Sequence, residues 1–111
     1  MFVTYISTTP TLEGLRITAY HDVVFGEVIV GTDVVRDFAA GFTNFFGGHS
    51  TEYEEVLSKA RGEAIGEMKK RAASLGANAV VGVDIDYESL GQMLMVTASG
   101  TAVTVESSEK E

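Results

Sequence analysis

The amino-acid sequence predicts one α+β domain, with its elements in the order β-β-α-α-β-β and a small antiparallel sheet that carries two helices. Three observations predict this class. β-branched and aromatic residues dominate both ends of the chain, helical periodicity is confined to the middle, and 111 residues is a usual length for a single domain. We assign residues 1–106 to this domain and residues 107–111 to a frayed polar tail.

The first part of the predicted sheet precedes the helices. Residues 2–6 are aromatic and β-branched, as is typical of a strand, and residues 7–10 favour a turn. Residues 15–30 are extended again. Because Gly26 interrupts this stretch, we expect a bulge, a bend or two shorter strands there.

The middle of the chain predicts two helices. Residues 33–46 carry valine and phenylalanine at helical spacing on one face. Residues 51–75 begin with a capping box, Thr51 with Glu54, and end before Gly76. The second helix has an apolar stripe. The stripe consists of Tyr53, Val56, Leu57, Ala60, Ala64, Ile65, Met68, Ala72 and Leu75.

The last third of the chain predicts a hairpin. A strand over residues 80–87 is followed by a turn at 88–92 and a long strand over 93–105. Alternation divides the side chains of the first strand into two sets. We expect Val81, Val83, Ile85 and Tyr87 on one face, and Val80, Gly82, Asp84 and Asp86 on the other.

Composition and charge exclude several classes of function. The formal net charge is −8, so nucleic acids and anionic membranes are not expected partners. The chain has no cysteine, which excludes thiolate metal sites, disulfides and thiol catalysis. Neither a signal peptide nor a membrane-spanning stretch is recognised, and we expect a cytoplasmic protein.

Strand edges without a neighbour predict self-association. A long hairpin and short N-terminal strands leave such edges, and open edges pair with other chains. Small residues over 98–102 allow a second strand to approach the last predicted strand closely. We therefore expect a homo-oligomer.

Short segments spread along the chain together resemble one family. They are Thr8–Gly14, Gly26-Glu27 with Gly31, Arg36-Asp37, Gly47-Gly48, Tyr53-Glu54, Ala60-Arg61, Leu75–Ala79, Asp86-Tyr87 and Ala98–Val103. This ordered set resembles the YbjQ-like family of small proteins, which bears a heavy-metal-binding label and has no determined function. The resemblance implies a dodecin-like subunit and a homopentameric ring closed by strand pairing. It supplies no catalytic residues, and His49 stands where the family leads us to expect arginine.

Three carboxylates are the candidate metal ligands. Asp84, Asp86 and Glu88 alternate along a predicted strand, so they project from one face about 6.5–7 Å apart. Their oxygens suit a hard divalent ion such as calcium, magnesium or manganese. The alternative is a solvated acidic strand face, and both interpretations stay open.

Ligands for soft metals are sparse. His21 and His49 lack the partner spacing of a zinc site, although a ring could bring copies of His49 together. Met93 and Met95 share a strand face and could bind copper(I), but methionine more commonly fills gaps in a core. The sequence therefore gives a heavy-metal site little support.

Arg61 falls within the apolar stripe of the second predicted helix. A buried guanidinium needs a partner, so we expect an ion pair that joins helix to sheet or subunit to subunit, with Glu27 or Asp37 as candidate partners and anion binding as the alternative.

Two glycine-containing segments are weaker candidates. Gly62 and Gly66 lie on the side of the helix away from the stripe, where a neighbouring helix could approach closely. The loop over residues 47–50 leads into a helix N-terminus that could hold a phosphate, but it has no P-loop or dinucleotide pattern.

Three classes of function are compatible with these observations. The chain could be a ring-forming structural or interaction module, an oligomer that binds a metal ion or small ligand at subunit interfaces, or an enzyme that uses interface carboxylates. No catalytic motif in the sequence favours the enzyme.

Overall fold

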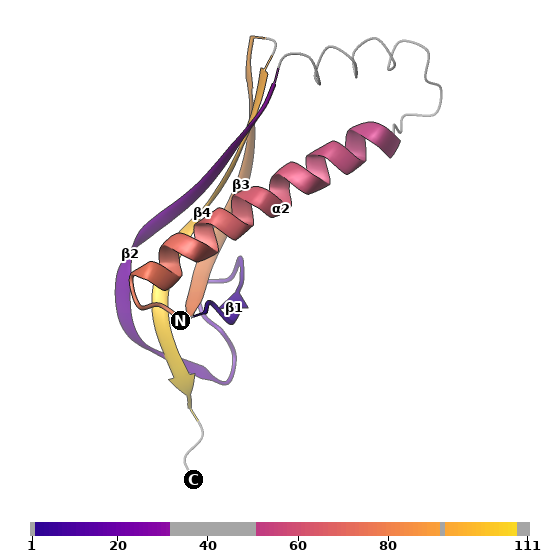
Figure 1. Ribbon diagram of the computed structural model, residues 1–111. Coiled ribbons are helices and arrows are strands. Elements are labelled where there is room, and N and C mark those ends of the chain that lie inside the picture. Colours follow the sequence, from indigo (N-terminus) through magenta and orange to yellow (C-terminus); the bar gives the residue numbers. More distant parts are fainter. Residues whose placement is uncertain (1, 32–50, 92, 109–111) are drawn as a thin grey trace.

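The computed structural model describes residues 2–31, 51–91 and 93–108. In this part of the chain, four strands form one sheet and a single long helix lies diagonally across one of its faces (Figure 1). The elements are β1 (Tyr5–Ile6), β2 (Leu15–Val30), α2 (Thr51–Ser74), β3 (Ala79–Leu90) and β4 (Met93–Ser107). The α+β class is confirmed, and the helix predicted over 33–46 lies outside the described residues.

The sheet is mixed, with the strand order β1-β3-β4-β2. β4 lies in the centre and pairs antiparallel with both β2 and β3. β1 pairs with β3 in parallel, through Tyr5 with Ala79 and Ile6 with Val80. The prediction of an antiparallel sheet is therefore wrong at this edge. The long connection from β1 to β3, which includes β2 and α2, allows the two strands to run in the same direction.

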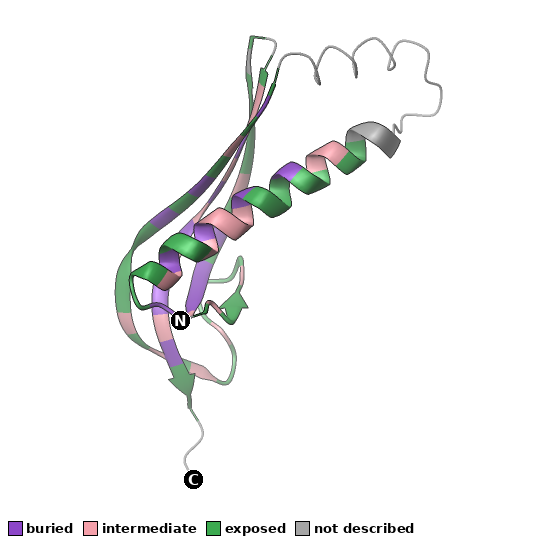
Figure 2. Ribbon diagram, viewed as in Figure 1, coloured by how far each residue is buried: buried purple, intermediate pink, exposed green. Residues whose placement is uncertain are grey.

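Alanines let α2 lie close to the sheet. Ala60, Ala64 and Ala72 are buried along its inner side together with the larger Met68, which follows the predicted stripe. Figure 2 shows buried positions recurring along the side of the helix that faces the sheet. Leu75 belongs to the predicted stripe but is 44% exposed, because the helix has already ended at Ser74. The sheet contributes Val24, Val30, Val80, Val83, Val96, Ala98 and Ala102 to the same core.

The C-terminus of α2 confirms the predicted glycine stop. Gly76 has a φ of 89°, in the left-handed region that favours glycine. The backbone N–H of Gly76 donates to the carbonyl of Ala73 at 3.0 Å, and that of Ala77 donates to the carbonyl of Ala72 at 3.1 Å. These bonds satisfy the last carbonyls of the helix in a Schellman-type arrangement.

Gly26 does not interrupt β2, so of the alternatives predicted at this position the bulge and the two shorter strands are wrong. The strand is continuous there, and Gly26 pairs with Ala98 of β4. The glycine serves a different purpose, because a Cβ at this position would overlap the backbone carbonyl oxygen of Ala64 in α2. The shifts in register lie earlier in β2, between Ile17 and Ala19 and between Tyr20 and Asp22.

A bulge in β3 changes which of its side chains share a face. The register shifts between Val81 and Asp84, and Gly82 has a φ of 62° there. Val80 and Val83 therefore both pack towards α2, whereas Val81 lies on the opposite face with Asp84. The predicted grouping of Val81 with Val83 is wrong because one extra residue interrupts the alternation.

The two ends of the hairpin also differ from the prediction. β3 continues to Leu90, so the turn into β4 is tighter than residues 88–92, and Gly91 has a φ of 63°. At the other end, β4 continues to Ser107, and the backbone N–H of Ser108 donates to the carbonyl of Gly14 at 3.1 Å. These two serines, which the sequence assigns to a frayed tail, are thus held by the sheet.

Within the described ranges, no helix combines the length and apolarity that crossing a membrane requires.

Candidate functional site

The predicted carboxylates lie on the face of the sheet opposite α2, which we call the open face. Asp84, Asp86 and Glu88 are all exposed there. The bulge at Gly82 places them on this face, because a regular strand would have turned them towards α2. Their partners across the ladder on β4 are Ser99 for Asp84, Thr97 for Asp86 and Met95 for Glu88.

Two of these carboxyl groups interact directly. A hydrogen bond with the Asp84 side chain and the charge of Asp84 raise the pKa of Asp86. Desolvation and the charge of Glu88 act in the same direction. The row is therefore an acidic patch in which Asp86 binds a proton more readily than an isolated aspartate.

The described residues of the chain do not form a metal centre by themselves. In the described ranges, no three His, Asp or Glu side chains approach one another closely enough to hold an ion. His21 lies on β2, and its Nε2 is 2.7 Å from Oγ1 of Thr104. His49 lies outside the described residues. Because the chain has no thiolate, the oxygen atoms of the acidic row suit a hard cation better than a soft metal.

An apolar strip of β2 lies on the open face, where β4 separates it from the acidic row and the exposed Glu27 interrupts it. Val23, Phe25 and Ile29 of β2 are 55%, 46% and 56% exposed. We did not single out this strip from the sequence. The signal for it is the lack of alternation in residues 23–25 and 28–30, which are apolar throughout and therefore present apolar side chains on both faces of β2. An antiparallel sheet with one solvated face normally turns polar residues outward.

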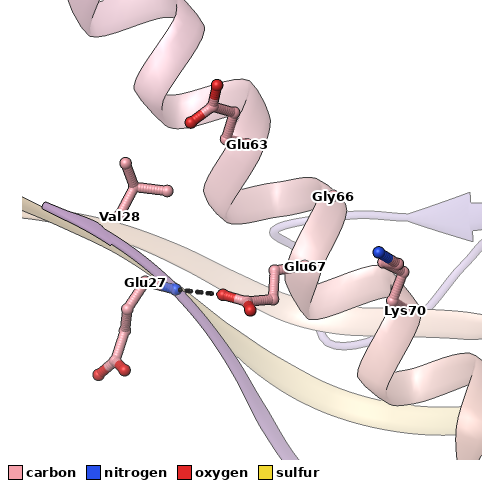
Figure 3. Close-up of a pocket in the computed structure, with 6 residues that line it drawn as sticks. All are labelled: Glu27, Val28, Glu63, Gly66, Glu67 and Lys70. Atoms are coloured by element: carbon pink, nitrogen blue, oxygen red, sulfur yellow. Dashed lines mark hydrogen bonds between the residues drawn. The ribbon is translucent and has the colours of Figure 1, made fainter.

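A groove runs between the outer edge of β2 and α2 (Figure 3). One part has a volume of about 450 Å³ and a second part about 330 Å³. Val28 and Glu63 line both parts, so the two are continuous. Glu27, Gly66, Glu67 and Lys70 complete the first part, and Ile29, Val30, Gly31, Val56, Lys59 and Ala60 complete the second.

Side chains from α2 cap part of the edge of β2. The backbone N–H of Glu27 donates to Oε1 of Glu67 at 3.3 Å, as Figure 3 shows. Nη1 of Arg71 donates to the carbonyl of Phe25 at 2.8 Å, and an ion pair of 3.4 Å joins Arg71 to Glu67. β2 is the last strand of the described sheet, so these backbone groups face away from β4. By the alternation of an antiparallel ladder, the backbone groups of Ile29 face the same way.

Arg61 is exposed in the described structure, so its predicted burial between helix and sheet within one chain is wrong. Its Nη1 donates to the hydroxyl of Tyr87 on β3 at 2.9 Å, rather than pairing with Glu27. Asp37, the other predicted partner, lies outside the described residues. Arg61 is exposed because the buried side of α2 is narrower than the predicted stripe. Ala64 is buried against the sheet, whereas Arg61 lies at the margin of the helix that faces β3.

The glycines of α2, the two methionines of β4 and the loop over 47–50 were the remaining candidates. A Cβ at Gly62 or Gly66 would meet nothing within 4 Å, and Gly66 lines the groove. Met93 is 37% exposed at the start of β4, and Met95 is half-buried. The loop over 47–50 lies outside the described residues.

Known proteins resemble this chain over most of its length. Residues 4–106 match the sequence model of the YbjQ family, whose description reads "Putative heavy-metal-binding". A UPF0145 protein of Clostridium kluyveri is 61% identical over 104 residues, covering 91% of this chain and 98% of that protein. A UPF0145 protein of Listeria monocytogenes is 56% identical over 107 residues, covering 94% and 97%.

Solved structures share the fold. One of them is a protein of unknown function from Pediococcus pentosaceus, assigned to the DUF74 family. The TM-score is 0.57 and the sequence identity 18%, over 91% of this chain and 96% of that one.

Proposed function

The chain belongs to the YbjQ family, and we propose that it functions as a homopentameric ring whose subunits join through the edges of their sheets. The family resemblance implies the number five. The proposal that copies of this chain associate at all rests on the subunit itself, and chiefly on one observation: both sides of its described sheet end in strand edges that its other described residues cover only in part.

The two edges belong to β2 and β3. β2 ends the sheet on one side. On the other side, β1 pairs only with Ala79 and Val80, and the last bond from the segment after it runs from the N–H of Val83 to the carbonyl of Ser7. The rest of β3, residues 84–90, therefore has no neighbour on its outer side among the described residues. Uncovered edges of this length are what strand pairing between chains requires.

The shape and surface of the subunit also support association. Its Cα radius of gyration is 17.3 Å, whereas a compact chain of this length has about 13 Å. The exposed apolar strip of Val23, Phe25 and Ile29 adds a surface that water solvates poorly. A long, thin subunit with an apolar strip gains most from burial against further copies of itself.

Native mass spectrometry of the purified protein at micromolar concentration tests this proposal. We expect a complex with five times the 11.8 kDa mass of the chain. A stable monomer at that concentration would contradict association, and another complete oligomer would contradict only the number five.

A second candidate function is weak binding of a hard divalent ion. We propose that Asp84, Asp86 and Glu88 from more than one subunit supply the ligands. Asp84 raises the pKa of Asp86 through a hydrogen bond and also through its charge, and this supports the role because a cation would relieve the repulsion between the charged carboxylates.

Titration with calcium, manganese, zinc and copper tests the acidic row, with an Asp84→Asn/Asp86→Asn variant as the matched comparison. We expect weak calcium or manganese binding that the variant loses and that weakens as pH falls, because protons compete for the carboxylates. Tight zinc or copper binding that survives in the variant would contradict the carboxylate site and favour histidine or methionine ligands.

A further inference from the structure

We propose that the open face of the sheet binds a cationic amphipathic α-helix of a partner protein, which lies along β4 with its apolar side on β2 and its basic side on β3. Such binding goes beyond the proposed ring and does not depend on the number of subunits, because pairing at strand edges joins copies side by side and leaves the faces of each sheet free. Three features of the open face support it: the arrangement of its side chains in rows, its width, and the distribution of charge over the subunit.

Part of the open face is uncovered in the described structure. At one end of the sheet, Leu12, Leu15 and Ile17 pack on this face against a small core of β3 and β4 residues. Beyond that core, Phe25 and Ile29 of β2 are 46% and 56% exposed. The opposite face of the same strands lies under α2 (Figure 1). Within the described residues, this part of the sheet is therefore covered by a helix on one face only.

The side chains of this uncovered part lie in rows that differ in chemistry. The row on β2 is apolar at both ends, the row on β4 is neutral, and the row on β3 is acidic. Residues of the three rows lie opposite one another in the ladder, as Phe25 with Ser99 and Asp84, and as Ile29 with Met95 and Glu88. A partner that matches this face must be apolar along one side and positively charged along the other.

The width of the face suits an α-helix. Neighbouring strands of a sheet lie about 4.8 Å apart, so the rows on β2 and β3 are about 10 Å apart across β4. An α-helix with its side chains is about 10–12 Å wide. Thr97 and Ser99 of β4 are short and half-buried, which leaves room above this strand. A helix that lies along β4 therefore reaches both rows, whereas an extended peptide turns only alternate side chains towards the sheet.

The distribution of charge favours a cationic partner. All but one of the lysines and arginines that the structure describes belong to α2, which lies on the other face. The exception, Arg16, is at the far end of β2 and pairs with Glu106 at 3.0 Å. On the open face, the charges of Asp84 and Glu88 help to raise the pKa of Asp86. Basic side chains of a partner would relieve this repulsion.

The middle of the face adds a requirement that makes the partner more specific. Glu27 lies between the two apolar residues of β2, opposite Thr97 and Asp86, and Figure 3 shows its side chain pointing away from α2. Phe25 and Ile29 are about 14 Å apart along the strand, which corresponds to about nine residues of a helix. We therefore expect two apolar residues about nine positions apart in the partner helix, with a basic residue about midway between them.

Two designed peptides of about 18 residues, long enough to form a helix, serve as probes. Both carry leucines along one side, and the other side carries lysines in one peptide and glutamates in the other. Fluorescence anisotropy with the purified wild-type protein should show that the lysine peptide binds, more weakly as salt concentration rises, and that the glutamate peptide does not. If the lysine peptide fails to bind, or both peptides bind equally, the proposed site is wrong.

Two pairs of charge variants locate the binding site. Asp84→Asn/Glu88→Gln removes two charges from the open face, and the matched control, Glu55→Gln/Glu63→Gln, removes two exposed charges from α2. The first pair should raise the Kd of the lysine peptide about fivefold or more, and the control should change it by less than about twofold. Equal losses in both proteins would show attraction to the net charge alone and would contradict a site on the open face.

A pair of aromatic variants tests the apolar side of the site. Phe25→Thr and Tyr20→Thr each replace an exposed aromatic residue of β2 by a residue that suits strands, but only Phe25 belongs to the proposed site. Phe25→Thr should weaken binding of the lysine peptide about tenfold, and Tyr20→Thr should leave it unchanged. Undiminished binding by Phe25→Thr, or equal weakening by both variants, would refute the apolar contact.

Circular dichroism and native mass spectrometry of all variants complete the test. Each variant should keep the fold and the assembly mass of the wild type. A folded Phe25→Thr protein with a different assembly mass would show that copies of this chain cover the open face, and would overturn the proposed partner. If Phe25→Thr fails to fold, the charge variants decide the question. A monomeric wild-type protein that still binds the lysine peptide at this face would contradict the ring and leave the helix site standing.

Discussion

Gly26→Ala is the substitution that most directly tests the packing of α2 on the sheet. A Cβ at this position would overlap the carbonyl oxygen of Ala64, and it would lie 2.7 Å from the backbone nitrogen of Met68 and 2.9 Å from the carbonyl carbon of Ala64. All three atoms belong to the helix backbone, so no side chain can rotate away. The helix as a whole must move.

The size of the effect follows from what that movement disturbs. To bring the nitrogen of Met68 from 2.7 Å to an ordinary contact of about 3.4 Å, α2 must withdraw by about 0.7 Å, and further for the carbonyl oxygen. Val24, Ala60, Ala64 and Met68 are no more than 4% exposed around this point. Overpacking costs about 1–3 kcal/mol, and a clash between backbones favours the upper end, about 3 kcal/mol. In a domain of this size, that corresponds to a fall of roughly 10–20 °C in melting temperature.

Thermal and urea unfolding at one fixed protein concentration measure this effect, because association makes melting temperatures depend on concentration. Gly31→Ala is the matched control, since its Cβ would meet nothing within 4 Å. The loss of stability for Gly100→Ala should fall between the two, because the nearest atom to its Cβ is a side-chain atom, Cγ1 of Val80 at 2.5 Å, and the nearest backbone atom is the carbonyl oxygen of Val81 at 3.1 Å. If the free energies of unfolding of Gly26→Ala and Gly31→Ala differed by less than about 0.5 kcal/mol, the close approach of α2 to β2 would be wrong.

Two further predictions concern exposed side chains. Arg61→Ala and Tyr87→Phe should each reduce the free energy of unfolding by less than about 1 kcal/mol, because they remove one exposed hydrogen bond; a urea-unfolding loss well above this would indicate that Arg61 is buried in the assembly. Asp86→Asn should stabilise the protein at neutral pH, because the pKa of Asp86 is raised in the folded state and its charged form is therefore disfavoured there. This advantage should shrink as pH falls through the raised pKa and vanish below the ordinary value of 3.8, where wild-type Asp86 is protonated in both states. Melting curves of both proteins across that pH range measure the difference in stability. If the advantage of Asp86→Asn over the wild type grew as pH fell, the prediction would be contradicted.

The elements that could be predicted are those that local chemistry determines. The length of α2 follows from its apolar stripe and from Gly76, and the hairpin of β3 and β4 follows from alternating apolar residues around Gly91. In each case, the residues that encode the element are neighbours in the sequence. The parallel pairing of β1 could not be predicted this way, because Tyr5 meets Ala79 across most of the chain.

Two glycines show where sequence reasoning about the sheet failed. Gly26 was expected to disturb its own strand, but it accommodates the backbone of α2, about forty residues later in the chain. Gly82 was expected to occupy an ordinary strand position, but it carries the bulge. A glycine looks the same in a sequence whether it serves a bend, a bulge or a close contact.

The candidate site was predictable only in part. The spacing of Asp84, Asp86 and Glu88 correctly placed them on one face of a strand, but not which face of the sheet that would be. The edge cap and the groove depend on Glu67 of α2 meeting Glu27 of β2. Nothing in either local sequence signals that contact.

The bulge at Gly82 gives β3 an unusual response to changes in chain length. Because Gly82 is the extra residue, a chain that lacked it would run directly from Val81 to Val83, and every later side chain would keep its present face. A β-branched residue at Gly82 would resist the φ of 62° and favour a regular strand. That straightened strand would turn Val83 outward and bring Asp84 against α2. At this position, a deletion is therefore the conservative change and a substitution the disruptive one.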